Sequence, residues 1–346
     1  MIGNKFNYVF VDGSFLLTRN LFVATKGKDI KDMNPGDVVK ITIQTLTKLA
    51  KTWGITADKI FLIFDEWDKN LGGYIRSWMI RDYVQYKGSR KWVTAKTIED
   101  MKNDPTISQE EIEKAERELA VNNVKFAAKS IMKEEFKNIG IPYVSWPGWE
   151  FDDIATMASF ILNGKTDKPN VIVTKDTDLQ YSLCPSCVFF SLPTSGSEPK
   201  IITYDEMYNT IPQTLKDRGV GLYQYHSFCD SLGISGHNDN LKTIKSGRNG
   251  ITTILHILDG DYSDVANKDA FDAQMKSFNL SLFPDVSEVQ NMILNKFQTL
   301  GHVGSLSVFR DFCNRNKISG ISDTYYMGLT ERFDQKLFSN EGNSNF

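Results

Sequence analysis

The chain has 346 residues, of which 41% are hydrophobic and 24% charged, and a formal net charge of −3. This length is enough for two domains with a hydrophobic core, and the charge excludes a generally basic, histone-like protein. Binding to a polyanion must therefore depend on local patches. No run approaches the roughly 20 apolar residues of a membrane span, and the first residues lack a signal peptide's apolar core. We therefore expect a cytoplasmic protein with no membrane contact.

The four cysteines indicate neither a disulfide scaffold nor a metal site. They are too few to cross-link a chain of this length. Cys184 and Cys187 form the motif "CPSC", but no second closely spaced pair of cysteines or histidines completes a zinc site. We expect free thiols.

Four short runs rich in β-branched and aromatic residues stop at acids or lead into them. "NYVFVD", "KIFLIFD" and "NVIVTKDTD" end in acids, and "IPYVSW" is followed closely by "GWEFDDIA". The acids at these points are Asp12, Asp65, Glu150, Asp152, Asp153, Asp176 and Asp178. Helical segments separate the runs, which predicts a parallel, doubly wound α/β sheet up to about residue 205. Because ligands bind at the carboxyl ends of parallel strands, we expect the acids to gather at one edge of the sheet.

Helices are expected on both sides of the "IPYVSW" run. One spans roughly residues 119–138 and stops at Gly140, since glycine commonly ends a helix. Another follows Glu150 and carries an apolar residue at every third or fourth position. Ser108 and Glu111 have the spacing of a capping box at the start of a further helix.

Carboxylates crowded at one edge of a sheet need cations. Like charges raise one another's pKa values, and the neighbouring sequence supplies few lysines or arginines to balance them. Oxygen ligands without histidine or thiolate suit Mg²⁺, for which Mn²⁺ is expected to substitute. So many acids exceed what one hydrated Mg²⁺ uses, which indicates a two-metal site of the kind that hydrolyses phosphodiesters. Taken singly, each acid could equally cap a turn or begin a helix.

Residues 69–96 form a basic segment interleaved with aromatic residues. Its cations are Lys69, Arg76, Arg81, Lys87, Arg90, Lys91 and Lys96, and its rings are Tyr74, Trp78, Tyr83, Tyr86 and Trp92. Cations that meet phosphates and rings that stack on bases favour single-stranded nucleic acid. The alternative is an amphipathic helix with a solvated basic face. Residues 98–118 are acidic, and we interpret residues 70–120 as a helical excursion over the acids.

The chain resembles the 5′-nuclease or flap endonuclease family. Within that family it is most similar to the phage RNase H branch. The resemblance lies in five blocks in the family's order: "VFVDGSFLLTR", "IFDEWDKN" with "YIRSW" and "YKGSRK", "GWEFDDIA", "VTKDTDLQ", and "GHNDN" with "GRNGITTIL". It covers about residues 7–321. It implies a PIN-like parallel-sheet nuclease domain in residues 1–205, with a helical arch at about 70–120. A helical DNA-binding domain in residues 206–346 would follow, with a helix-three-turn-helix element at about 238–258.

The resemblance also implies roles for individual residues. Asp239 would join the strand-end acids in holding two Mg²⁺, and the catalytic carboxylates would be Asp12, Asp65, Glu150, Asp152 and Asp176. Lys87 and Arg90 would act at the scissile phosphate, and Tyr86 would stack on a terminal base. Nucleic-acid contacts are expected for Arg19, Arg76, Arg81, Tyr86, Lys87, Arg90, Lys91, Lys242, Lys245, Gly247, Arg248 and Gly250. A simple surface loop would explain the two glycines equally well.

Two positions depart from the family pattern. Phe151 stands where the family usually has alanine. Of the family's later aspartate pair only Asp239 is present, with Gly236 or His237 in the other place. We therefore expect the second metal to bind more weakly than in relatives with the full pattern.

These motifs predict a structure-specific 5′ to 3′ exonuclease or flap endonuclease. It would remove RNA primers or 5′ flaps during phage DNA replication, in the cytoplasm of an infected bacterial cell. Its partners would be forked or flapped DNA and RNA–DNA duplexes with a 5′ end, with a single-stranded-DNA-binding protein or a sliding clamp for recruitment. We expect a monomer. The alternatives are a non-catalytic, structure-specific nucleic-acid binder with a degenerate metal site, and a small phosphatase using the same acids.

Overall fold

The computed structural model describes residues 6–26, 29–83, 93–192, 199–234, 242–298 and 305–330. Within these residues, six strands form one sheet in the order β3-β2-β1-β4-β5-β6. The strands are β1 (Val9–Asp12), β2 (Ile60–Ile63), β3 (Tyr143–Val144), β4 (Asn170–Val173), β5 (Cys187–Ser191) and β6 (Lys200–Thr203). Neighbouring strands are parallel except β5 and β6. The predicted α/β fold with a mainly parallel sheet is confirmed.

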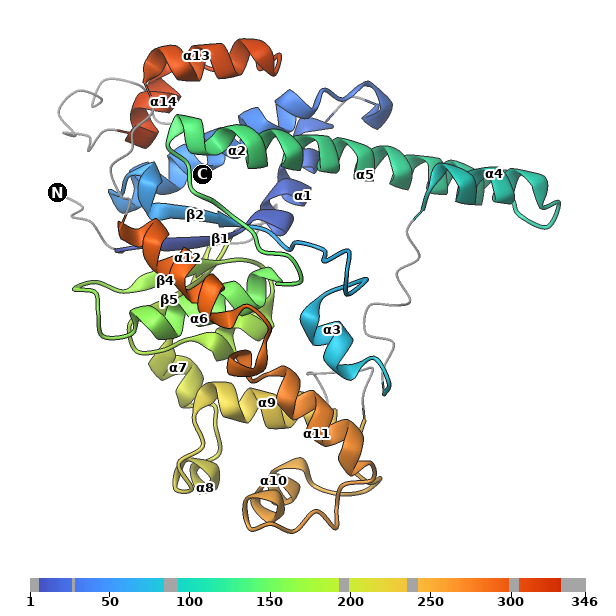
Figure 1. Cartoon of the computed structure of the whole chain (residues 1–346), viewed down its shortest axis with the longest axis vertical. Coiled ribbons are helices and arrows are strands. Elements are labelled where there is room, and N and C mark those ends of the chain that lie inside the picture. Colours follow the sequence, from blue (N-terminus) through green and yellow to red (C-terminus); the bar gives the residue numbers. More distant parts are fainter. Residues whose placement is uncertain are drawn as a thin grey trace.

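Helices cover both faces of this sheet (Figure 1). The α-helices are α1 (Gly13–Ala24), α2 (Pro35–Trp53), α3 (Ile75–Ile80), α4 (Ala95–Asn103), α5 (Gln109–Glu135), α6 (Phe151–Leu162), α7 (Tyr204–Tyr208), α8 (Gln213–Lys216), α9 (Leu222–Leu232), α10 (Gly250–Leu258), α11 (Lys268–Ser277), α12 (Val286–Gln298), α13 (Leu306–Arg315) and α14 (Asp323–Thr330). The 3₁₀ helices are η1 (Ile30–Asp32), η2 (Ala57–Lys59), η3 (Phe136–Ile139), η4 (Thr177–Ser182) and η5 (Leu280–Leu282). Along the described residues, no helix combines the length and apolarity needed to cross a membrane.

Alternating strand residues fill separate cores on the two faces of the sheet. On β1, Val9 and Val11 belong to the core beneath α1, α2 and α5, whereas Phe10 belongs to the core beneath α6. Successive side chains of a strand face opposite sides, so strands buried on both faces are apolar along their whole length. Polar chemistry is therefore confined to the ends of the strands.

The helix predicted to begin at the Ser108 capping box and the helix predicted over residues 119–138 are one helix in the structure, α5, which begins at Gln109. The predicted capping box is present: the Ser108 hydroxyl accepts from the backbone N of Glu111 at 3.3 Å, and the Glu111 carboxylate accepts from the backbone N of Ser108 at 2.9 Å. After η3 the chain turns at Gly140, whose φ of 78° lies in the left-handed region, as predicted. The continuity of the two predicted helices was missed because the early turns of α5 are mostly exposed and carry charged residues on several faces.

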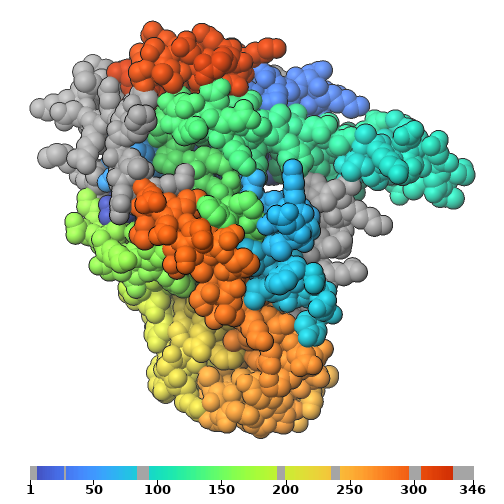
Figure 2. Space-filling view, in the orientation of Figure 1, coloured from blue at the N-terminus to red at the C-terminus, as the bar shows by residue number. Residues whose placement is uncertain are grey.

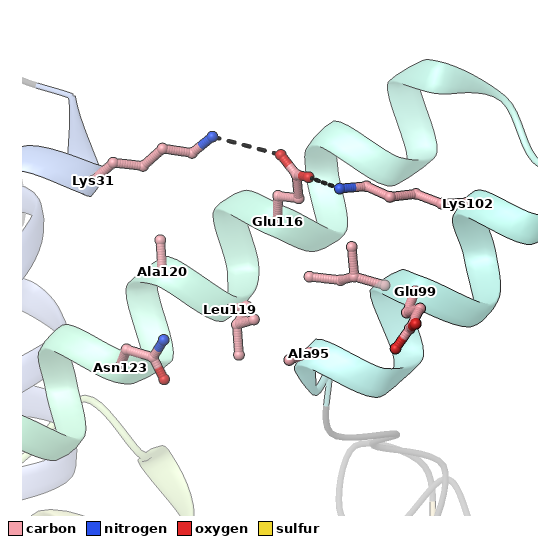
Figure 3. Close-up of a pocket in the computed structure, with 9 residues that line it drawn as sticks. Lys31, Ala95, Glu99, Lys102, Glu116, Leu119, Ala120 and Asn123 are labelled. Carbon is pink, nitrogen blue, oxygen red and sulfur yellow. Dashed lines mark hydrogen bonds and ion pairs between the residues drawn. The ribbon is translucent and has the colours of Figure 1, made fainter.

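Helices α4 and α5 form a hairpin that extends beyond the rest of the molecule (Figures 1 and 2). A small apolar cluster that includes Ile98 and Ile112 holds the two helices together. Beside a shallow pocket between them, Glu116 pairs with Lys102 of α4 at 2.7 Å and with Lys31 of η1 at 3.5 Å (Figure 3). Among the described residues, α5 itself and the Lys31–Glu116 ion pair therefore join the hairpin to the main body.

The last described helices pack back onto the first half of the chain. Phe309 of α13 and Tyr326 of α14 belong to the core that α2 and α5 cover. Arg315 also pairs with Glu135 of α5 at 2.7 Å. Helices α8 to α11 lie at the opposite end of the molecule (Figure 1). The domain division at residue 205 stays a prediction, but α13 and α14 share a core with the sheet rather than with α8 to α11.

Candidate metal centre and nucleic-acid interface

Three neighbouring parallel strands deliver acids to one edge of the sheet. Asp12 is the last residue of β1 and lies in register with Ile63, the last residue of β2. Asp65 follows β2, and Asp176 follows β4, which ends at Val173. Because the strands run in the same direction, their acids lie at the same edge, where the sequence predicted them.

Asp12 is held by hydrogen bonds to both carboxylate oxygens. Oδ1 accepts from the backbone N of Phe15 at 2.8 Å and so caps α1, and Oδ2 accepts from the Thr174 hydroxyl at 2.8 Å. The same hydroxyl accepts from the backbone N of Asp176 at 3.2 Å. Thr174 is fully buried and connects the end of β1 to the end of β4.

Asp65 is held between α1 and α6. Its Oδ1 accepts from the backbone N of Phe151 at 2.8 Å, and its Oδ2 accepts from the Ser14 hydroxyl at 3.5 Å. A Cβ at Gly13 would lie 2.6 Å from the ring of Phe64, so α1 can begin this close to β2 only with glycine. The motif "VDGS" therefore positions Asp12 and brings a second hydrogen-bond donor to Asp65.

Burial and mutual repulsion raise the pKa values of three of these acids. Burial raises the pKa of Asp12 to about 6, and the charges of Asp65 and Asp176 add to this effect. Burial, together with repulsion from Asp176, also raises the pKa of Asp178 to about 6. The pKa of Asp152 is raised well above its usual value by burial and by the carboxylates around it, Asp176 foremost. Full ionisation of the group therefore needs cations.

The donor set fits hard divalent cations. The acids in this group that would hold metal are Asp12, Asp65, Glu150, Asp152, Asp176 and Asp178, and carboxylate oxygens are the ligands that Mg²⁺ and Mn²⁺ prefer. Among the described residues, no three carboxylate, histidine or cysteine side chains already converge closely enough to enclose an ion. Because like charges repel, we expect the carboxylates to close only around cations that neutralise them.

Replacing Asp12 by asparagine should stabilise the metal-free protein at neutral pH. The pKa of Asp12 rises from 3.8 to about 6 on folding, so the folded protein binds this proton more tightly than the unfolded chain. Stability is therefore lost as the pH rises through this window, and the loss is complete above about pH 6. We expect Asp12→Asn in EDTA to melt above the wild type at pH 7.5, with the difference closing towards pH 4. In millimolar Mg²⁺ at pH 7.5, the order should reverse, and an unchanged order would contradict a metal site at Asp12.

Asp153 has a different environment from the other acids. Its carboxylate is 1% exposed and pairs with the guanidinium of Arg76 on α3, which is itself 13% exposed. The guanidinium also lies 4.7 Å from the ring centre of Phe278. The sequence predicted Asp153 as a metal ligand and Arg76 as a nucleic-acid contact. Both assignments stay predictions, and the buried ion pair favours a structural role for the two side chains.

Part of the predicted nucleic-acid surface is exposed on and after α3 (Figure 2). The Arg81 side chain is 62% exposed, and its guanidinium lies 5.4 Å from the ring centre of Trp78, which is 41% exposed. Tyr83 is exposed next to them in sequence. Arg19 is half-buried on α1, where burial lowers its pKa. The predicted residues Tyr86, Lys87, Arg90, Lys91 and Asp239, and the positions Gly236 and His237, lie outside the described residues.

Two of the three cations predicted near α10 are exposed but already bonded to other groups of the chain. Lys245 Nζ donates to the backbone carbonyl of Ser263 at 2.6 Å, and Arg248 pairs with Asp264 at 2.9 Å. Lys242 is exposed as well. These contacts fix the loop before α10 against the segment that follows it, and contact of its cations with nucleic acid stays a prediction.

Gly247 and Gly250, the two glycines predicted to contact nucleic acid, are needed for different structural reasons. Gly247 adopts a φ of 78° in open space, so it serves the turn before α10. A Cβ at Gly250 would lie 2.6 Å from the side chain of Ile234, so this glycine permits close packing of α10. Phosphate binding by their backbone N–H groups stays a prediction.

Sequence reasoning missed other residues of the site. Thr174 and Lys129 contact Asp12 and Asp65 from distant parts of the chain. Asp230 of α9, held by Gln274 at 2.8 Å, contributes to the raised pKa of Asp178, after burial and Asp176. A lone acid on the buried face of the helix containing "FCDSL" was the available signal for Asp230.

The fold and these acids define a parallel-sheet protein with a carboxylate site at the strand ends. Neither protein-family models nor curated protein sequences match the chain. Among solved structures, the bacteriophage T5 5′-exonuclease with bound zinc is 17% identical, with a TM-score of 0.45 and coverage of 90% of this chain and 98% of the other. The catalytic core of Rad2 with DNA is 15% identical, with a TM-score of 0.43 and coverage of 95% and 92%.

Human GEN1 in complex with Holliday junction DNA is 12% identical, with a TM-score of 0.45 and coverage of 93% of this chain and 70% of the other. At these identities and TM-scores the likeness concerns the outline of the fold.

Proposed function

We propose that this protein is a structure-specific 5′ nuclease that depends on divalent metal. The observation that carries the proposal is the position of Asp12, Asp65 and Asp176 at or just beyond the carboxyl ends of neighbouring parallel strands. The charges of Asp65 and Asp176 add to the effect of burial in raising the pKa of Asp12, which supports binding of cations by this group. The exposed ring and cation at Trp78 and Arg81 support a nucleic-acid substrate.

The residues of the chain would divide the work between the reaction and the substrate. Asp12 and Asp65 are oriented by backbone and hydroxyl donors, which leaves carboxylate lone pairs for metal. Bound Mg²⁺, for which Mn²⁺ would substitute, would lower the pKa of water and stabilise negative charge on the phosphate. Arg81 and Trp78 would bind the single-stranded arm through its phosphates and bases.

The finer assignment follows the sequence motifs. We propose 5′ to 3′ exonuclease and flap endonuclease action on forked or flapped DNA and on RNA–DNA duplexes, which would remove RNA primers or 5′ flaps in phage DNA replication. A monomer, recruited by a single-stranded-DNA-binding protein or a sliding clamp in the infected cell, completes the proposal. Weak binding of the second metal is expected from the missing aspartate near Gly236.

A panel of labelled substrates tests this function. We expect cleavage of 5′ flaps and of RNA–DNA duplexes from the 5′ end, little cleavage of 3′ flaps, and none of p-nitrophenyl phosphate. Binding to flaps without cleavage under any metal would instead identify a non-catalytic binder. Turnover of p-nitrophenyl phosphate alone would identify a phosphatase.

Lys87→Ala should lower turnover more than affinity. A cation next to the scissile phosphate contributes most as charge develops in the transition state, and removing one such group costs about 10²–10³ in kcat. Lys96→Ala, near the start of α4, should instead raise KM and flatten its salt dependence. Steady-state cleavage of a 5′ flap at several salt concentrations separates the two effects. Identical changes in KM alone would make Lys87 a binding residue.

A further inference from the structure

A lysine of α5 contacts the peptide group of a metal-site acid. Lys129 Nζ donates to the backbone carbonyl oxygen of Asp65 at 2.6 Å. It also lies 3.4 Å from Oε2 of Glu66 and 5.5 Å from the ring centre of Phe64. One turn further along α5, Lys133 pairs with Oε1 of Glu66 at 2.7 Å. One face of α5 thus holds the three residues that follow β2.

These contacts are sheltered from water. The side chains of Lys129 and Glu66 are 24% and 22% exposed. Salt screens partly buried charges less than it screens surface charges. The interaction between Lys129 and Glu66 is therefore stronger than a typical surface ion pair. Lys133, which is 51% exposed, closes the group on its outer side.

Asp65 is fixed on both sides by its neighbours in the chain. The backbone N of Phe64 donates to Val144 at 2.9 Å, and the backbone N of Glu66 donates to Trp149 at 3.1 Å. The carbonyl oxygen of Asp65 points to α5 and accepts from Lys129. Without that donor, the peptide group after Asp65 would keep only the bond from its N–H to the carbonyl oxygen of Trp149, and the carboxylate of Asp65 would be less firmly oriented. A displacement of about 1 Å in a catalytic group costs on the order of 10²-fold in rate.

We propose that Lys129 is a positioning residue for Asp65 and ties the α4–α5 hairpin to the metal site. The inference rests on the proposed nuclease function. Lys129 acts through the peptide of Asp65 and not on the reacting atoms. Because α5 continues from this contact into the hairpin as one 27-residue helix, a nucleic-acid strand held by the hairpin and a metal ligand would share one rigid element (Figure 1).

Lys129→Met tests the proposal against Lys137→Met as a matched control. Lys137 is exposed in η3, two turns further along, so its replacement removes the same charge without touching Asp65. We expect Lys129→Met to lower kcat on a 5′ flap by about 10- to 100-fold, with KM changed less than about twofold. Calorimetric titration with Mn²⁺, without nucleic acid, should show weaker binding than in the wild type. Lys129→Arg should recover most of both losses, and Lys137→Met should match the wild type.

Equal behaviour of Lys129→Met and Lys137→Met, or a change in KM alone, would overturn the proposal. If Lys129→Met does not fold, as judged by circular dichroism, Lys129→Gln provides the second test, because it keeps a polar side chain but removes the charge and is too short to make the same contact with the Asp65 carbonyl oxygen. We expect a loss of kcat and of Mn²⁺ affinity, and wild-type values for both would also overturn the proposal. If the wild type binds Mn²⁺ but cleaves nothing, the nuclease function fails, and calorimetry alone decides the role of Lys129.

Discussion

Asp176→Asn should lower the rate of 5′ flap cleavage by about a thousandfold, equivalent to about 4 kcal/mol of lost transition-state stabilisation. The Asp176 side chain caps η4 by accepting from the backbone N of Asp178 at 3.1 Å. Asparagine keeps this acceptor, so the substitution removes one charge and one metal ligand with little effect on the local fold. Binding of the flap in Ca²⁺ should be unchanged or tighter, because a negative charge near the phosphates is lost.

The matched control for Asp176 is Asp29→Asn. Asp29 caps η1 in the same way, by accepting from the backbone N of Lys31 at 3.0 Å, but it lies on an exposed turn away from the strand ends. Single-turnover cleavage by purified, folded variants gives the comparison. A rate above a tenth of the wild-type value in Asp176→Asn, or an equal loss in Asp29→Asn, would contradict the assignment of Asp176 as a metal ligand.

Arg76→Met should destabilise the protein by about 3–5 kcal/mol, because it leaves the buried carboxylate of Asp153 without its cation. Arg81→Met is the control, since its ion pair with Asp82 is exposed at 3.8 Å and such pairs contribute about 0–1 kcal/mol. Urea unfolding gives both values. Adding Asp153→Asn to Arg76→Met should recover part of the loss, because it removes the unpaired charge.

The same variants decide the role of Asp153. If this acid is structural, the double variant Arg76→Met, Asp153→Asn should keep the Mg²⁺ dependence of the wild type at temperatures where it is folded. If Asp153 binds metal, the double variant should need more Mg²⁺ for half-maximal rate. A cost below about 1 kcal/mol for Arg76→Met would show that the ion pair is not buried in solution.

The features that were predicted correctly from the sequence each depend on a short stretch of the chain. The strand-end acids, the capping box at Ser108 and the turn at Gly140 each depend on a few consecutive residues. A parallel sheet then brings distant strand ends to one edge, so the position of Asp12 beside the ends of β2 and β4 followed from chain order alone.

The features that sequence did not predict depend on contacts between distant segments. The Arg76–Asp153 pair joins α3 to α6, and Lys129 contacts Asp65 from α5, which begins in the hairpin. The sequence alone does not show whether a basic residue contacts a phosphate, a carboxylate or a carbonyl oxygen. The packing of α13 onto the core beneath α2 was hidden for the same reason, because an amphipathic helix does not specify which apolar surface it covers.

The central claim is that the strand-end carboxylates form a metal-dependent phosphodiesterase. The most direct test is cleavage of a 5′-labelled flapped duplex by the wild type in Mg²⁺, after EDTA, and after Mg²⁺ is restored. Short labelled products should appear with Mg²⁺, cease with EDTA and return in full when Mg²⁺ is added back. Cleavage that continues in excess EDTA, or a flap that stays bound and intact at every Mg²⁺ and Mn²⁺ concentration, would contradict the account.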